Sequence, residues 1–182
     1  MCDLWNGFGQ PTSLFGWGCT NNVPTNAVCL WSNVNCDSCN VNVVLLMIES
    51  VNLVGTLSPS IGELTALTFL AISSDSLHGS IPSTITALTL LASLNLGYNL
   101  LTGTIPSQVG DLTALNFFYL STNSLHGTIP NVFQNMASLS AFDVSSNQLT
   151  GYVPASICGR STTALYTNNN PNLIACSGDL KP

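Results

Sequence analysis

The chain has 182 residues, a length that suits one domain, and 46% of them are hydrophobic, which is enough for a continuous core. Only 5% are charged, against roughly 25% in an ordinary soluble domain, and the formal net charge is −6. Because there are only two basic residues and no apolar stretch long enough to cross a bilayer, we expect no nucleic acid partner and no membrane insertion.

The amino-terminal segment, residues 1–42, is rich in cysteine. It holds five of the seven cysteines, and the other two follow the central repeats: Cys2, Cys19, Cys29, Cys36, Cys39, Cys158 and Cys176. Zinc is one interpretation, because Cys36 and Cys39 form a CxxC pair, but no histidine precedes His78. Disulfides fit better, because crosslinks are most useful in end segments that have a neighbour on one side only.

Disulfides imply an oxidising compartment, so we expect an extracellular, secreted or cell-surface protein whose leader was removed or lies outside this chain. We expect no metal and no cofactor. The odd number of cysteines leaves one thiol that is free or joined to another chain.

Residues 43–154 are predicted to form five consecutive units, because one apolar pattern recurs every 24 residues. The four clear copies begin at Leu67, Leu91, Leu115 and Leu139, and a weaker first copy begins at Val43. A repeat of this length indicates a solenoid, in which each unit buries its apolar side only against the units beside it.

The copy that begins at Leu91 illustrates how one unit is expected to fold. Residues 94–96 form a short strand whose two leucines point inward while Asn95 points outward. Gly103 permits a tight bend, and Pro106 presets the backbone for a helical turn.

Asn99 is expected to bond the backbone of the turn and of neighbouring copies, in a ladder with Asn123 and Asn147. Asp75 holds the same position one copy earlier. It can keep only the acceptor half of that role.

These units resemble the plant-type leucine-rich repeat, whose pattern is LxxLxLxxNxLxGxIPxxLxxLxx. Residues 112–130 read LTALNFFYLSTNSLHGTIP, and residues 29–36 read CLWSNVNC, which is similar to the CxWxxVxC cap of that family. The resemblance covers roughly residues 14–158. It implies an α/β solenoid, a right-handed superhelix with a concave parallel β-sheet, a second short sheet from the LxGxIP segments, and 3-10 or short helical turns on the convex side.

The resemblance also implies disulfide-bonded caps, at residues 1–42 and 155–182. It pairs Cys29 with Cys36, and Cys158 with Cys176. Two of the remaining cysteines are expected to pair, and the sequence does not indicate which two.

The outward positions of the concave strands are the candidate binding surface, since the repeat itself does not use them. They fall into three columns: Leu45, Phe69, Ser93, Phe117 and Ala141; Met47, Ala71, Asn95, Tyr119 and Asp143; Glu49, Ser73, Gly97, Ser121 and Ser145. Six apolar or aromatic side chains are expected to be exposed there: Leu45, Met47, Phe69, Tyr98, Phe117 and Tyr119. The predicted ligand-binding residues are Phe69, Asn95, Tyr98, Phe117, Tyr119 and Asp143.

Catalysis is not expected. Glu49 and Asp143 lie four copies apart, roughly 19 Å at the strand spacing of a sheet, which is too far for a glycosidase pair. His78 and His126 lie two copies apart, and no Ser–His–acid or Cys–His cluster emerges.

We expect a non-enzymatic recognition module that binds a protein, or a neutral glycan, through the aromatic side chains of this face. The main alternative is a self-associating structural subunit of a matrix or filament, because low charge and an apolar face suit packing between copies. No Asn lies in an Asn-x-Ser/Thr sequence, so any covering sugar would be O-linked.

Two further functions known for this type of repeat fit less well. Ice binding would need a regular threonine ladder, and the column of Thr56, Ser80, Thr104, Thr128 and Tyr152 is interrupted. Polygalacturonase inhibition would be expected to use a charged concave face, and this face has two acids and no base.

Overall fold

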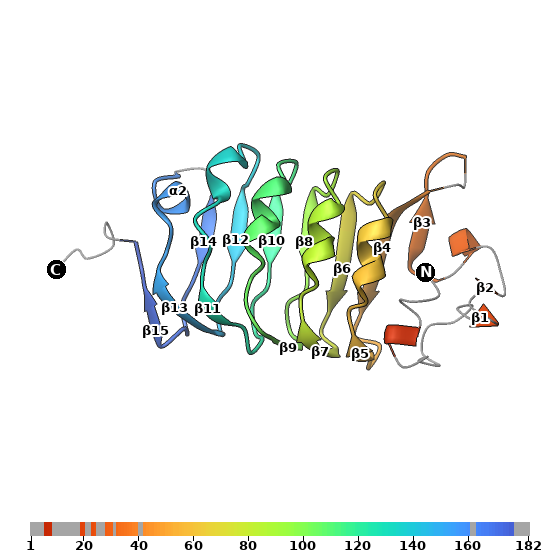
Figure 1. Cartoon of the computed structure of the whole chain (residues 1–182), viewed down its shortest axis with the longest axis horizontal. Coiled ribbons are helices and arrows are strands. Elements are labelled where there is room, and N and C mark those ends of the chain that lie inside the picture. The colour runs from red at the N-terminus through yellow and green to blue at the C-terminus, as the bar shows by residue number, and fades with distance from the viewer. Residues whose placement is uncertain are drawn as a thin grey trace.

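The protein is a row of stacked coils with one long sheet along its side (Figure 1). The computed structural model describes residues 6–8, 19–20, 23–24, 28–30, 32–39, 42–160 and 163–176. Within that part of the chain, no helix is long and apolar enough to cross a membrane.

The main sheet has seven strands in the spatial order β14-β12-β10-β8-β6-β4-β3. The strands are β3 (Val34–Cys36), β4 (Val43–Glu49), β6 (Phe69–Ser73), β8 (Ser93–Asn95), β10 (Phe117–Tyr119), β12 (Ala141–Asp143) and β14 (Ala164–Tyr166). All pairs are parallel except β3 with β4, so the cap strand closes one end of the sheet in the opposite direction. The predicted concave parallel sheet is confirmed.

The predicted second sheet is present in two parts of three strands each. One part contains β5 (Val54–Thr56), β7 (Ser76–Ser80) and β9 (Leu100–Thr102), and the other contains β11 (His126–Thr128), β13 (Gln148–Tyr152) and β15 (Asn172–Ile174). Two backbone hydrogen bonds still connect the parts, from Ser124 N–H to the Leu101 carbonyl and from His126 N–H to the Gly103 carbonyl, both 2.8 Å.

Short helical turns complete the convex side of the coils, as the resemblance implied. They are the 3-10 turns η2 (Pro59–Glu63), η3 (Ser83–Ala87), η4 (Ser107–Asp111) and η5 (Phe133–Asn135), and the single α-helical turn α2 (Ala155–Cys158). A proline precedes η3, η4 and α2 in an extended conformation, and Pro59 begins η2. These prolines start the turns at fixed positions because their φ is preset and they need no backbone donor.

Short elements also lie in the described part of the amino-terminal cap. They are the antiparallel pair β1 (Cys19–Thr20) and β2 (Val23–Pro24) and the 3-10 turn η1 (Val28–Leu30).

The core runs along the inside of the stack and is filled by the repeated apolar positions. The inward residues of the main strands are at most 1% exposed: Leu46, Leu70, Leu94, Phe118 and Phe142. Phe133 from η5 meets two of them edge to face, with ring centroids 6.1 Å from Phe118 and 5.1 Å from Phe142. Aromatic rings thus replace leucine toward the carboxy-terminal end of the core without breaking the pattern.

A ladder of asparagine side chains joins successive coils, as predicted. The Asn99 amide donates to the carbonyls of Ile72, Leu96 and Gly97, and its oxygen accepts from Leu77 N–H. Equivalent hydrogen bonds are made by Asn123, Asn147 and Asn170. Each side chain therefore satisfies buried backbone groups of two coils.

Asp75 keeps only the acceptor half of this role, also as predicted. Its Oδ1 accepts from Val51 N–H at 3.0 Å and Leu53 N–H at 2.9 Å. Its Oδ2 is buried and has no hydrogen-bond partner among the described residues.

Among the described residues, two disulfides close the ends of the solenoid. They join Cys29 to Cys36 and Cys158 to Cys176, the pairs that the resemblance implied. Cys39 carries a free, exposed thiol. The pair expected among Cys2, Cys19 and Cys39 depends on Cys2, which lies outside the described residues.

Candidate binding face

The outward side chains of the main strands lie in the columns expected from the sequence. The strand register aligns Leu45, Phe69, Ser93, Phe117 and Ala141 in one column, and Met47, Ala71, Asn95, Tyr119 and Asp143 in the next. Strands in a sheet lie about 4.8 Å apart, so each column is a close row of neighbouring side chains.

The exposure of these side chains is less uniform than expected. Tyr98 is 61% exposed, and Phe117 and Met47 are each 40% exposed. Three other side chains were expected to be exposed but are half-buried: Leu45, Phe69 and Tyr119. Side chains on adjacent strands of a sheet stand close enough to touch, which lowers the exposure of each one. The face therefore offers aromatic surface that is already held in place.

Phe117 and Tyr119 form an ordered pair on β10. Their ring centroids are 6.2 Å apart and their planes differ by 27°, a stacked arrangement. Burial raises the pKa of Tyr119, and the Asp143 carboxylate and the Tyr166 hydroxyl raise it further. The Tyr119 hydroxyl therefore keeps its proton at neutral pH and can donate a hydrogen bond.

Asn95 and Asp143 hold the same outward column and make the same local turn. Asn95 Oδ1 accepts from Gly97 N–H at 3.0 Å. Asp143 Oδ1 accepts from Ser145 N–H at 2.9 Å and from Ser145 Oγ at 2.6 Å. Both side chains are thus oriented by their own backbone before any ligand arrives.

Tyr98 stands in an unusual backbone conformation. Its φ is +55°, and the equivalent residues of the other coils also have positive φ: Ser50, Ser74, Thr122, Ser146 and Asn169. The other residues of this column are small and polar, whereas a bulky residue at positive φ is rare and carries strain. Tyr98 is therefore an exposed aromatic side chain on a backbone conformation that small polar residues adopt in the other coils.

Tyr166 is a candidate binding residue that sequence reasoning missed. It lies on β14 in register with Asp143, and it is 53% exposed. Residues 155–182 were predicted to form the carboxy-terminal cap, and within this range β14 adds one more strand to the main sheet. The signal was present, because Leu165 and Asn170 have the same spacing of five residues as Phe142 and Asn147.

The threonines of the second sheet serve the packing of the coils. A Cβ added at Gly127 would lie 2.9 Å from Thr104 Cγ2, and one added at Gly151 would lie 3.0 Å from Thr128 Cγ2. The threonine methyl groups thus lie directly over glycines of the following coil, which have φ of +77° and +78°. The threonine methyl groups therefore contribute to the packing of successive coils.

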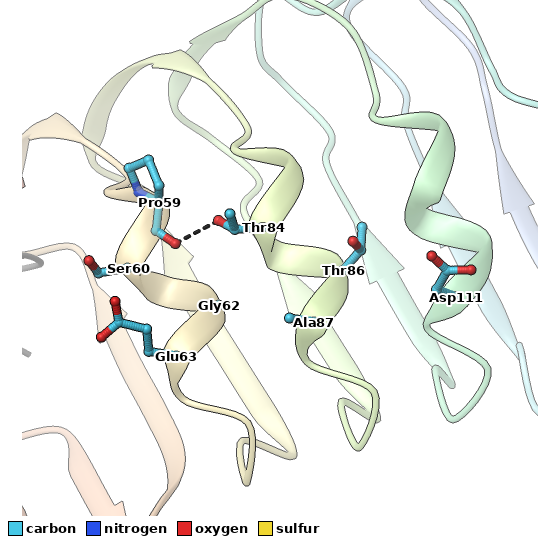
Figure 2. A pocket seen from close by; sticks show the side chains of 8 residues that line it. All are labelled: Pro59, Ser60, Gly62, Glu63, Thr84, Thr86, Ala87 and Asp111. Atoms are coloured by element: carbon cyan, nitrogen blue, oxygen red, sulfur yellow. Dashed lines mark hydrogen bonds between the residues drawn. The ribbon is translucent and has the colours of Figure 1, made fainter.

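A hollow of about 620 Å³ lies on the convex side, over η2, η3 and η4 (Figure 2). The turns η2 and η3 approach closely, because a Cβ at Gly62 would lie 2.3 Å from the Thr84 carbonyl oxygen. Thr84 Oγ1 donates to the Pro59 carbonyl at 2.6 Å, as Figure 2 shows. None of the predicted binding residues lines this hollow.

The described residues bring together no group of three or more His, Cys, Asp or Glu that could hold a metal ion. His78 and His126 are exposed on different strands of the second sheet, β7 and β11.

Comparisons with known proteins point to one kind of repeat. Residues 89–149 match the family model described as leucine rich repeat. The BIR2 ectodomain from Arabidopsis thaliana is similar, with a TM-score of 0.83 and 28% identity over 99% of this chain and 96% of that one. A chain of the BIR3–SERK2 complex from Arabidopsis thaliana has a TM-score of 0.80 and 30% identity, over 94% of this chain and 93% of that one.

A plant ice-binding protein is also similar, with a TM-score of 0.61 and 29% identity over 86% of this chain and 57% of that one. No curated protein matches the sequence significantly.

Proposed function

Because this chain belongs to the leucine-rich repeat family, we propose that it is an extracellular, non-enzymatic recognition module. It binds a protein partner through the outward side of the main sheet. The residues proposed to contact the partner are Phe69, Asn95, Tyr98, Phe117, Tyr119 and Asp143.

The observation that carries this proposal is the contrast between two neighbours on β10. Phe118 is fully buried and belongs to the repeat, whereas Phe117 is 40% exposed at a position that the repeat leaves free. Aromatic side chains bury a large area at a low cost in conformational entropy, and they are enriched at binding hot spots. Two stacked rings on β10, together with a strained and exposed Tyr98 in the turn after β8, fit a contact surface.

The similar solved structures support a protein as the partner. One of them is a complex between two proteins, BIR3 and SERK2, and the matched chain is covered over 93% of its length. The two disulfides fit an oxidising environment outside the cell.

The other candidate functions have less support. A neutral glycan would also suit aromatic rings, but no feature of the face favours a sugar over a protein. Ice binding is weakened by the packing role of the threonines, and polygalacturonase inhibition by the low charge of the face. Self-assembly remains the runner-up, and sedimentation tests it, since a persistent monomer at high concentration would remove it.

Selection from a random peptide library tests the proposed function. We expect peptides selected on the wild-type protein to lose binding to a Phe117→Ala/Tyr119→Ala variant. The matched control is Val54→Ala/Leu100→Ala, because both side chains are 57% exposed on the second sheet. Peptides that bind both variants as well as wild type would refute the binding face.

A further inference from the structure

Asp143 lies between two tyrosines on the outward side of the main sheet. The register pairs Tyr119 of β10 with Asp143 of β12, and Asp143 with Tyr166 of β14. At about 4.8 Å per strand, the backbones of the two tyrosines lie about 10 Å apart, with the backbone of Asp143 midway between them. A carboxylate is thus flanked by two aromatic side chains on one surface.

The Asp143 carboxylate is held in place through one oxygen, and its second oxygen is available to a ligand. Asp143 Oδ1 accepts both hydrogen bonds from Ser145. Oδ2 receives no hydrogen bond from any described residue, and the side chain is only half-buried. One oxygen is therefore fixed by the turn, and the other faces outward with its charge available.

No cation of the described chain neutralises this charge. Arg160 is the basic residue within the described ranges, since Lys181 lies outside them. Its guanidinium donates to the carbonyls of Ser156, Met136 and Phe133, so it is occupied at the end of η5. The whole chain carries a net charge of −6. A partner that binds next to Asp143 gains from bringing a positive charge.

The surroundings of Asp143 suit a cation with an apolar stem. Phe117 stacks on Tyr119 and extends the aromatic surface along β10. Ala141 lies beside Phe117 in the next strand and has a small, nearly buried side chain, 7% exposed. Aromatic faces attract ammonium and guanidinium groups, and the methylene stem of Lys or Arg packs well on apolar surface.

From this arrangement we propose that Tyr119, Asp143 and Tyr166 form the site for a lysine or arginine side chain of the protein partner. The cation lies between the two tyrosine rings and pairs with the outward oxygen of Asp143. This inference rests on the proposed function and specifies the partner: the segment that docks at the carboxy-terminal end of the face carries a basic residue.

The test uses a pair of small probes that differ in charge and little in shape. Acetyl-arginine amide and acetyl-citrulline amide are titrated against the whole protein, and the ring resonances of Tyr119 and Tyr166 are followed by NMR. We expect arginine to shift both sets of resonances and to bind at least about fivefold more tightly than citrulline. The preference should shrink as salt is added, because the pair is partly exposed.

An Asp143→Asn variant isolates the charge. Asparagine should preserve the turn, because Asn95 already makes it in the same column. We expect the variant to bind arginine no better than citrulline. The control Asp111→Asn removes an exposed acid of η4 on the convex side and should leave the arginine preference unchanged.

Equal affinity for the two probes, failure of both to bind, or an unchanged preference in Asp143→Asn would each overturn this inference. These outcomes are distinct from failure of the binding face. If library peptides depend on Phe117 and Tyr119 but the arginine preference is missing, the face stands and the cation site does not.

Discussion

The two sides of the same strands follow different rules. The inward column, from Leu46 to Phe142, repeats large apolar residues that are at most 1% exposed. The outward column, from Leu45 to Ala141, changes residue type from each strand to the next. The inward side is constrained by packing against the next coil, whereas the outward side is free to vary. The residues of the outward side are therefore expected to determine binding specificity.

The largest expected contrast is between two adjacent phenylalanines. Phe118→Ala should lower the free energy of unfolding by about 3–5 kcal/mol, because it leaves a cavity in the core. Phe117→Ala should lower it by less than about 1 kcal/mol, because its ring is partly solvated. Urea denaturation followed by circular dichroism measures both. Similar losses for the two variants would contradict the division of roles.

Asp75 offers a gain of stability on the scaffold side. Asp75→Asn supplies an amide where Oδ2 is buried without a partner, and the amide of Asn99 at the equivalent position donates to three carbonyls. We expect the free energy of unfolding to rise by about 1–3 kcal/mol. The reverse change, Asn99→Asp, should lower it by a similar amount. A destabilised Asp75→Asn would show that Oδ2 is satisfied by water or an ion.

Substitution of Tyr98 should change stability and peptide affinity in opposite directions. Tyr98→Asn places a residue that tolerates positive φ at this turn, and should raise the free energy of unfolding by about 0.5–1 kcal/mol. The same variant should bind library peptides more weakly, because an exposed aromatic ring is lost. Thr122→Asn changes the equivalent turn of the next coil and should leave peptide affinity unchanged. Unchanged stability and unchanged peptide affinity in Tyr98→Asn would contradict both the strain and the binding role proposed for Tyr98.

The smallest effect concerns the proton of Tyr119. Burial, Asp143 and Tyr166 raise the pKa of Tyr119 in the folded state. The protonated hydroxyl therefore contributes fully to the free energy of unfolding below the ordinary tyrosine pKa. This contribution is lost as the pH rises through the raised value. Asp143→Asn removes one cause and should move the pKa of Tyr119 back toward the ordinary value. NMR titration of its ring resonances measures this change. An unchanged titration would place Asp143 too far away to act.

Much of the fold could be predicted because the same sequence pattern occurs in five copies. The inward leucines, the asparagine ladder and the prolines before the helical turns recur at fixed spacing, so each copy supports the others. The acceptor role of Asp75 also followed from its functional groups.

The carboxy-terminal limit of the repeats was not predicted, although the last coil carries part of the same pattern. The strand β14 escaped notice because the last coil is one residue shorter between asparagines, from Asn147 to Asn170, than the earlier ones. Tyr166 was missed with it. The partial burial of Phe69 and Tyr119 depends on which side chains stand next to them across strands, and a single-strand pattern does not contain that information.

The most direct test of the account is the affinity of Phe117→Ala for peptides selected on the wild-type protein. We predict at least about tenfold weaker binding with an unchanged circular dichroism spectrum. Wild-type affinity in a folded Phe117→Ala variant would contradict the claim that the aromatic outward side of the main sheet is the binding face.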